Sequence, residues 1–289
     1  MRLIITTALV SMLSAPAMAC DIDGKTGFLP ENDLKISTTA KFRSDMTEAR
    51  FNEIIDIADK YYRPIVKEKG GKLKWSRGWN NDTVNASAQR SFFGGTWKVN
   101  MYGGLARHPL VTDDGFALVV CHELGHHLAG TPTNSFPNTW ASVEGQSDYF
   151  ATLKCFRRMF ESDNNEQIVA NMGEIPESVI NKCNANFTLP NDRALCVRAS
   201  MGGLSLAKLL GSLRGNSNVD FDTPDADVVS RTNSSHPAAQ CRLDTYFQGA
   251  LCDIPYSEEV GKDPLAGTCN RSEGYKDGVR PLCWYKPAE

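Results

Sequence analysis

The chain has 289 residues, with 31 Lys or Arg and 34 Asp or Glu, so its formal charge is −3 at neutral pH. This near-balance argues against a nucleic-acid-binding surface and against a polybasic membrane patch. We find no internal repeat, low-complexity tract or long run of like charges. The length is sufficient for one domain with a substantial core, with or without a small appendage.

The first 19 residues have the pattern of a secretory signal peptide. Arg2 gives a positive start, residues 3–13 form a short apolar segment, and residues 17–19 (Ala-Met-Ala) form a small-x-small cleavage site. We therefore expect an exported protein, periplasmic or extracellular, with no transmembrane segment. Its mature chain would begin at Cys20, and only acylation of Cys20 would associate it with a membrane. Ala17, where a lipobox usually has Leu, disfavours acylation.

All nine cysteines follow residue 19. In an exported protein most cysteines form disulfides, and an odd number leaves at least one free. We predict that Cys121 is the free one, because it lies in an apolar helix where a buried thiol acts as a small apolar side chain. Among the other eight we favour local pairs such as Cys183–Cys196 and Cys269–Cys283.

One long helix and two strands are predicted in the first hundred residues. From Asp45 to Lys67 apolar residues recur at helical spacing, and a glycine pair ends the run. Residues 72–76 alternate like a half-buried strand. Thr96–Tyr102 has strand chemistry and lies between two further glycine pairs.

The most informative stretch is H-E-x-x-H at residues 122–126, in an apolar helical run with an N-cap and an acidic first turn at residues 112–114. Four residues along an α-helix give about 40° of rotation, so His122 and His126 project from one face. Two imidazoles so placed can bind one Zn²⁺, and Glu123 can act as general base on a water there. The alternative is a surface helix with solvated histidines, but chance produces this pattern only about 0.004 times in such a chain.

A catalytic zinc site needs a third protein ligand. A metzincin site would place Gly and His three and six residues after His126, where this chain has Ala129 and Pro132. That arrangement is therefore excluded. Glu144 fits as the third ligand, in a following helix that we expect residues 138–139 (Asn-Thr) to cap.

Asp148 lies one helical turn after Glu144 and could accept a proton from a ligand imidazole or fix an arginine. The alternative is two solvated acids on a surface helix. Arg242 could pair with Asp148. His236, between Ser and Pro, is either an ordinary loop residue or a donor to the oxyanion formed when water attacks a carbonyl. His127 is expected to face away from the metal, as a supporting or surface residue.

Together these pieces resemble the zinc metallopeptidase family of the CAAX prenyl proteases and the HtpX-like and periplasmic barrel-assembly-enhancing proteases. The matching motifs span about residues 84–243 and comprise the strand, H-E-x-x-H, Glu144 with Asp148, and Ser-His-Pro with Arg242. The transmembrane helices of the prenyl and HtpX branches are absent, and Glu144 follows the motif sooner than is usual in the family.

This resemblance implies a mainly helical α+β gluzincin fold with a small antiparallel sheet. It also implies one catalytic zinc on His122, His126 and Glu144, with Glu123 activating water. His236 would stand at the metal, either steadying the transition state or capping the site, and Arg242 would support it. An edge strand above the metal commonly pairs with extended substrate in such peptidases, and Thr96–Tyr102 is either that strand or an ordinary one.

We therefore expect a metallopeptidase domain over residues 20–250 and a Cys-rich tail over residues 251–289 packed on it. Residues 161–200 are expected to be mostly loops, and Met201–Leu213 an apolar core helix. The expected function is an exported zinc endopeptidase acting on a protein or peptide substrate. The alternatives are a latent, zinc-stabilised binding or chaperone-like module and an enzyme that hydrolyses a non-protein amide.

Overall fold

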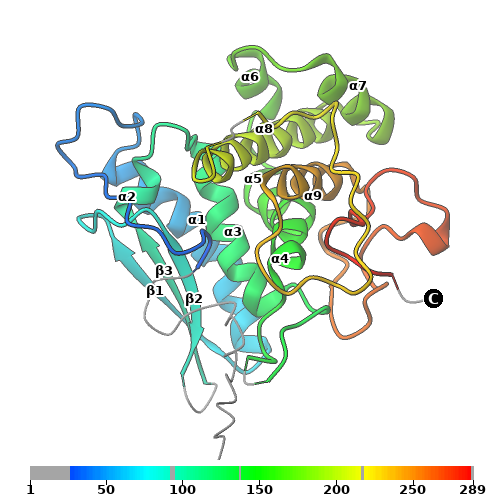
Figure 1. Cartoon of the computed structure of the whole chain (residues 1–289), viewed down its shortest axis with the longest axis horizontal. Helices are drawn as coiled ribbons and strands as arrows, with labels where there is room; N and C mark the ends of the chain where they lie inside the picture. Colours follow the sequence, from blue (N-terminus) through cyan, green and yellow to red (C-terminus); the bar gives the residue numbers. More distant parts are fainter. Residues whose placement is uncertain (1–26, 92–94, 137, 216–217, 288–289) are drawn as a thin grey trace, which may run out of the picture.

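The computed structural model describes residues 27–91, 95–136, 138–215 and 218–287; the expected signal peptide and Cys20 lie outside them (Figure 1). The fold is α+β and mainly helical, with helix α3 between a small sheet on one side and helices α4 and α8 on the other (Figure 1). The strands are β1 Lys72–Gly78, β2 Ala86–Arg90 and β3 Thr96–Tyr102. The helices are α1 Glu48–Glu68, α2 Gly103–Ala106, α3 Asp113–Leu128, α4 Glu144–Phe150, the π-helix η1 Ala151–Phe156, α5 Arg157–Phe160, α6 Asn165–Ala170, α7 Glu177–Asn186, α8 Pro190–Ser212, α9 Ala239–Leu251 and the 3₁₀ turn η2 Arg271–Glu273.

The sheet is mixed, not antiparallel as expected, with strand order β1-β3-β2. The hairpin makes β2 antiparallel to β3, whereas β1 joins the other edge of β3 in parallel. Of the two alternatives for Thr96–Tyr102, the structure therefore supports the ordinary sheet strand and not the edge strand. Both edges of β3 are already paired, so β3 cannot pair with a substrate, and the outer edges of the sheet belong to β1 and β2.

Helix α1 extends through its proline to Glu68. Thr47 caps it by accepting a hydrogen bond from the Arg50 backbone N–H, and one face buries apolar side chains including Phe51. Pro64 lies on the exposed side and does not end the helix. The chain instead leaves the helix before Gly70, which has a φ of 79°.

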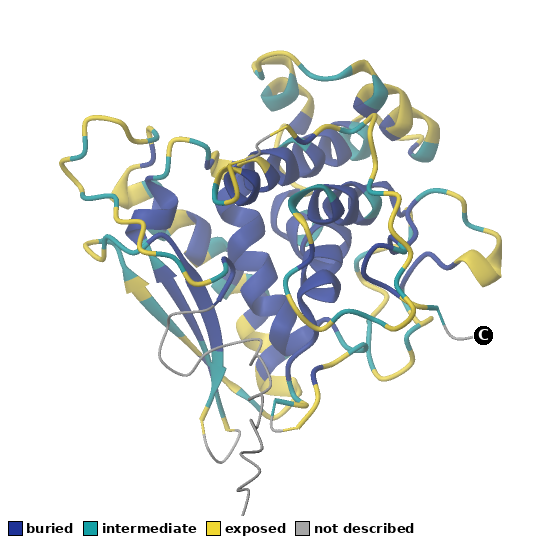
Figure 2. Ribbon diagram, viewed as in Figure 1, coloured by how far each residue is buried: buried dark blue, intermediate teal, exposed yellow. Residues whose placement is uncertain are grey.

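Residues 161–200 contain more helix than expected, because α6, α7 and the first half of α8 lie in this range. Figure 2 shows α6 and α7 as largely exposed, whereas α3, α4 and α8 are buried. A short, polar helix lacks the long apolar periodicity by which a buried helix is recognised in a sequence. Among the described residues α8 alone is long and apolar enough to cross a membrane, and 89% of its most apolar window is buried inside the protein, as in a core helix.

Four disulfides connect the described cysteines, as is typical of proteins in an oxidising, exported environment. The predicted Cys183–Cys196 bond is present. The other cysteine predictions were wrong. Cys121 is not free, because its sulfur points from α3 toward η1 and bonds to Cys155.

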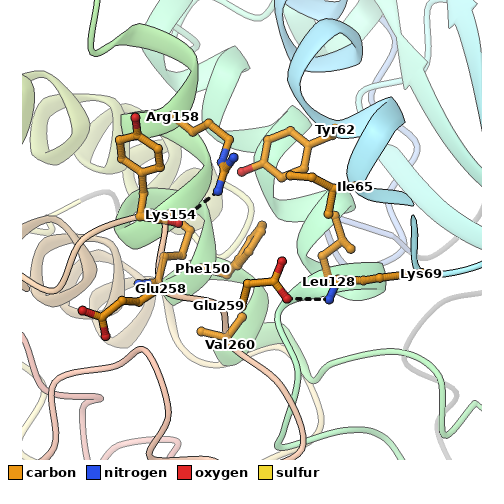
Figure 3. Close-up of a pocket in the computed structure, with 11 residues that line it drawn as sticks. Tyr62, Ile65, Lys69, Leu128, Phe150, Lys154, Arg158, Glu258, Glu259 and Val260 are labelled. Atoms are coloured by element: carbon orange, nitrogen blue, oxygen red, sulfur yellow. Dashed lines mark hydrogen bonds and ion pairs between the residues drawn. The ribbon is translucent and has the colours of Figure 1, made fainter. Parts of the chain in front are cut away.

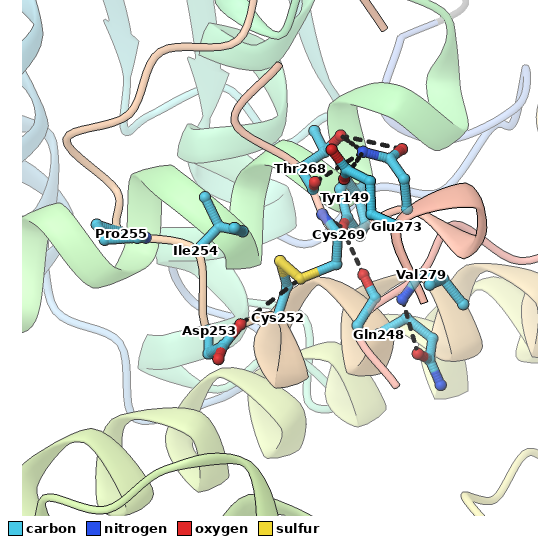
Figure 4. Close-up of a disulfide and its surroundings, with 12 residues drawn as sticks. Tyr149, Gln248, Cys252, Asp253, Ile254, Pro255, Thr268, Cys269, Glu273 and Val279 are labelled. Atoms are coloured by element: carbon cyan, nitrogen blue, oxygen red, sulfur yellow. Dashed lines mark hydrogen bonds between the residues drawn. A yellow bond between two sulfur atoms is a disulfide. The ribbon is translucent and has the colours of Figure 1, made fainter. Parts of the chain in front are cut away.

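The predicted Cys269–Cys283 pair was also wrong, because two separate bonds join the tail to the end and the start of α9. They are Cys252–Cys269, shown in Figure 4, and Cys241–Cys283. Over its described residues, 252–287, the segment after α9 contains one 3₁₀ turn and one isolated β-bridge, and it packs on α4, where Trp284 covers Gly145. The conformation of this loop-rich segment is thus restricted mainly by disulfides and not by helices or strands.

Candidate metal centre

Helix α3 places the H-E-x-x-H residues in the middle of the protein. Thr112 caps the helix by accepting a hydrogen bond from the Gly115 N–H at 3.0 Å, and two aspartates lie in its first turn. Because the helix has the sheet on one side and helices on the other, nearly all of it is buried. His122, Glu123 and His126 are each 0% exposed. Buried polar groups of this kind must be paired or must bind something.

Helix α4 brings Glu144 to the two histidines. The carboxylate lies 3.3 Å from His122 Nε2 and 3.6 Å from His126 Nε2. The close approach of the helices requires Gly125, since a Cβ there would lie 3.0 Å from the Ser147 Cα. The expected N-cap at residues 138–139 was wrong, because α4 begins at Glu144 itself.

The Nδ1 atom of each imidazole already has a hydrogen-bond partner. His122 Nδ1 lies 2.7 Å from Asp148 Oδ1, and His126 Nδ1 lies 2.8 Å from the carbonyl oxygen of Ser142. Both partners are hydrogen-bond acceptors, so each Nδ1 carries a proton and, in the neutral ring that binds a metal, each Nε2 presents the lone pair. The two lone pairs face the Glu144 carboxylate.

The inner atoms of the cluster have no hydrogen-bond partner although they are buried. This is the case for both Nε2 atoms and for both carboxylate oxygens of Glu144. Ligand atoms of His122, His126 and Glu144 all lie within 4.8 Å of one another, as a bound metal ion would require. A cation in this position would satisfy every one of these atoms, so the donor set fits a metal ion.

Asp148 and Arg242 form a buried pair behind His122. Arg242 Nε and Nη2 lie 2.6 Å and 2.7 Å from the two oxygens of Asp148, which is a bidentate arrangement. Burial raises the pKa of the Asp148 carboxyl, but Arg242 and His122 outweigh burial and lower it. The carboxylate is thus kept ionised and fixed where it can orient the His122 ring.

The cluster is electrostatically suited to a cation. Burial lowers the pKa of His122, but Asp148 and Glu144 together raise it to about 9. Burial also opposes ionisation of Glu144, yet the surrounding histidines hold its pKa well below the usual range. Burial lowers the pKa of His126 to about 4. Without a metal, therefore, the site retains one proton between a histidine and an ionised glutamate, and a metal ion would replace that proton.

Glu123 stands next to the cluster without being part of it. Both of its carboxylate oxygens are buried and have no hydrogen-bond partner. Burial raises the pKa of the Glu123 carboxyl to about 8. A carboxylate that can gain and lose a proton near neutral pH is suited to proton transfer rather than to permanent pairing.

His236 also reaches the cluster, where its Nε2 lies 3.6 Å from Glu144 Oε2. The same nitrogen is 2.7 Å from the carbonyl oxygen of Gly27. Phe28 then packs edge-on against His122, with the ring centroids 5.2 Å apart, and its N–H donates to the Ala86 carbonyl oxygen on β2. The segment Gly27–Leu29 therefore lies between the outer edge of β2 and the histidines. The sequence gives no signal for it, because the residues around it show no periodicity.

His127 is neither at the surface nor directed at the cluster. It is buried and stacks on Trp97 and on Trp140, with ring centroids at 5.4 Å and 4.9 Å. Arg90 lies over the Trp97 ring and donates to the His127 carbonyl oxygen. This stack connects the start of the loop between α3 and α4 to the sheet. Its aromatic residues lie between positions 97 and 140, too far apart to form a recognisable sequence pattern.

Two hollows lie near the cluster. The pocket of Figure 3 is formed by α1, the ends of α3 and α4, η1, α5 and the loop from Tyr256 to Val260, and no metal-cluster residue lines it. A polar groove of about 600 Å³ lies between residues 132–135 and 229–235. Its lining includes Val143 and Ser235, the residues just before Glu144 and His236. The groove is therefore lined by the chain neighbours of Glu144 and His236, but by no metal-cluster residue itself.

Comparison of the chain with protein-family models, with curated proteins and with solved structures gave no match. What the structure supports is a His-x-x-x-His helix with a glutamate from the next helix, arranged as a possible metal site.

Proposed function

We propose that this protein is an exported, zinc-dependent endopeptidase of the gluzincin type. The observation that carries the proposal is the orientation of the imidazoles. Each Nδ1 is engaged by an acceptor, so both Nε2 lone pairs converge, without partners, on an equally unpartnered glutamate. Two histidines and one glutamate are a donor set of catalytic zinc sites, which keep a position for water or substrate.

Bound zinc would polarise a substrate carbonyl and acidify a water molecule. The residues of this chain supply the proton transfers. Glu123 takes a proton from the attacking water and returns it to the leaving amine, and its raised pKa brings the carboxyl close to the pH at which a base is most effective. Asp148 and Arg242 orient His122 and hold it in one tautomer.

His236 is proposed to steady the oxyanion. Its Nε2 already lies 2.7 Å from a peptide carbonyl oxygen, that of Gly27, beside Glu144. A substrate carbonyl in a similar position would receive the same hydrogen bond, which strengthens as negative charge develops on the oxygen. The polar groove next to Val143 and Ser235 offers room for the peptide that carries this carbonyl.

The contact between His236 and the Gly27 carbonyl also favours a second candidate function, a latent zinc-stabilised module. Gly27 engages His236 and Phe28 covers His122, so a substrate must compete with this segment of the chain. X-ray absorption on the zinc-loaded protein distinguishes the two candidates. Three protein ligands plus a water support the enzyme, and four protein ligands support the latent module.

The proposal is tested with zinc analysis and casein cleavage on the chain from residue 20, with and without chelator. We expect one zinc per chain and cleavage that the chelator abolishes. Glu123→Gln should keep the zinc and the fold but lose cleavage by about 10²–10⁴-fold, because only the proton acceptor is removed. Glu68→Gln, at the exposed end of α1, is the matched control. Undiminished cleavage by Glu123→Gln would refute the mechanism.

A further inference from the structure

Four arginine side chains are almost completely buried in the part of the chain that the structure describes. They are Arg107, Arg198, Arg242 and Arg280. In the first three, every guanidinium nitrogen donates a hydrogen bond and at least one partner is a carboxylate. Arginine is normally buried only in this way, because an unpaired charge in the interior is costly.

Arg280 differs from the other three. Its Nη2 donates to the Pro264 carbonyl at 2.7 Å and to Thr268 Oγ1 at 3.2 Å. Its Nε and Nη1 are buried and have no hydrogen-bond partner, and it forms no ion pair with any described acid. The rings of Tyr149 and Tyr285 lie 5.4 Å and 4.7 Å from the guanidinium carbon. Cation–π contacts of this kind contribute only about 0.5–2 kcal/mol, so within the described part of the chain the charge of Arg280 has no counter-charge.

Arg280 lines a cavity of about 540 Å³ in the disulfide-bonded tail. A second guanidinium, that of Arg271, lines the same cavity, and its Nη1 donates to the Arg280 carbonyl oxygen at 2.6 Å. Among the described residues that line the cavity the only acid is Asp263, whose Oδ1 accepts a hydrogen bond from the Leu265 N–H. The cavity is therefore net positive, with further polar groups from Asn270 and Ser272 and an apolar wall from the remaining residues.

The cavity is rigidly built. Figure 4 shows the Cys252–Cys269 disulfide with Thr268 on one side and Tyr149 and Val279 nearby. Tyr149 projects from α4 and donates from its hydroxyl to the Gly278 carbonyl, which holds the Arg280 segment against that helix. The guanidinium is thus fixed in place before any ligand arrives, which reduces the entropy that binding would cost.

We propose that this cavity binds a small oxyanion, a carboxylate or a phosphate, with Arg280 as the buried anchor and Arg271 at the rim. A planar guanidinium matches the oxygens of either group, and an anion supplies both the missing charge and the missing hydrogen-bond acceptors. The site shares no residue with the metal cluster, so it is independent of the proposed peptidase activity.

The test uses the zinc-loaded chain from residue 20 and titrates it with sodium phosphate and, separately, sodium acetate. Sodium chloride at matched ionic strength is the reference for both, in calorimetry and in thermal unfolding. We expect saturable binding and a rise in Tm with one of the oxyanions, which identifies its class, and no such rise with chloride. Absence of saturable binding by both oxyanions, or an equal effect of chloride, would overturn the proposal.

Arg280→Gln should weaken oxyanion binding at least tenfold while casein cleavage stays unchanged, and Arg271→Gln should weaken it several-fold. Arg214→Gln, at an exposed position after α8, is the matched control and should bind like the wild type. Since Arg271 is exposed, its variant keeps the test valid if Arg280→Gln does not fold. Binding that persists in both variants, including binding at the metal, would contradict the assignment.

Discussion

Asp148 Oδ1 lies 2.7 Å from Nδ1 of His122, and both residues are 0% exposed. Through this contact the position of one candidate metal ligand depends on Arg242, which is 94 residues further along the chain and binds the same carboxylate. The cluster is therefore held together by its outer contacts even before a metal binds.

We expect Asp148→Asn to lower zinc affinity about 10–100-fold, because one amide oxygen cannot replace the two carboxylate oxygens that accept from His122 and Arg242, and the His122 tautomer and orientation are then no longer fixed. The variant also leaves Arg242 without its carboxylate, so the free energy of unfolding should fall by about 3 kcal/mol. Competition with a chromogenic chelator measures the affinity. Asp33→Asn, at an exposed loop position, is the control, and equal affinities of the two variants would refute the role of Asp148.

Removing the Cys121–Cys155 disulfide should weaken metal binding as well as stability. The bond closes a loop of 34 residues and joins the histidine helix to η1, so replacing both cysteines with Ala should cost about 3–4 kcal/mol. Zinc affinity should fall too, because α3 is then less firmly held against the helix that continues from Glu144.

The matched control is the double Ala variant of Cys183–Cys196, which joins α7 to α8. This variant should lose stability but keep zinc affinity, since neither helix supplies a ligand. Chemical unfolding and chelator competition on both double variants give the comparison. Loss of affinity in the control alone would contradict the argument.

Lys154 should make stability depend on pH. Its side chain is 3% exposed and donates to the Pro255 carbonyl oxygen, and burial, reinforced by Arg157, lowers its pKa from 10.5 to about 7. Between about pH 7 and 10.5 the unfolded lysine binds the proton that the folded one has released. The free energy of unfolding from this group therefore rises with pH through that window, and the full penalty applies below pH 7.

Lys154→Met should thus raise the free energy of unfolding, relative to the wild type, more at pH 6 than at pH 10. The difference should be on the order of 2–4 kcal/mol, from about 1.4 kcal/mol per pKa unit. Urea unfolding at the two pH values measures it, with Lys74→Met at an exposed position of β1 as the control. If the free energies of unfolding of Lys154→Met and the wild type differ by the same amount at both pH values, Lys154 stays charged in the folded protein.

Several features were predictable from the sequence because they depend on neighbours along the chain. The spacing of His122 and His126 follows from helical geometry, and Thr112 reveals where their helix begins. Glu144 could be named as the companion carboxylate because it follows within 18 residues in an apolar context. The helix ending at Glu68 and the strand Thr96–Tyr102 could be predicted from their periodicity and their flanking glycines.

Other features were decided only by the tertiary structure. Three of them are pairings between segments that are distant in the sequence: the disulfide of Cys121, the pairing of β3 with both β1 and β2, and the contact of His236 with Gly27. No local pattern encodes such a pairing, because it depends on which faces meet once the core forms. The unpaired charge of Arg280 could likewise be recognised only in the structure, where the other buried arginines among the described residues are seen to contact carboxylates. The sequence alone thus determined which groups can bind a cation, and packing determined which atoms face one another.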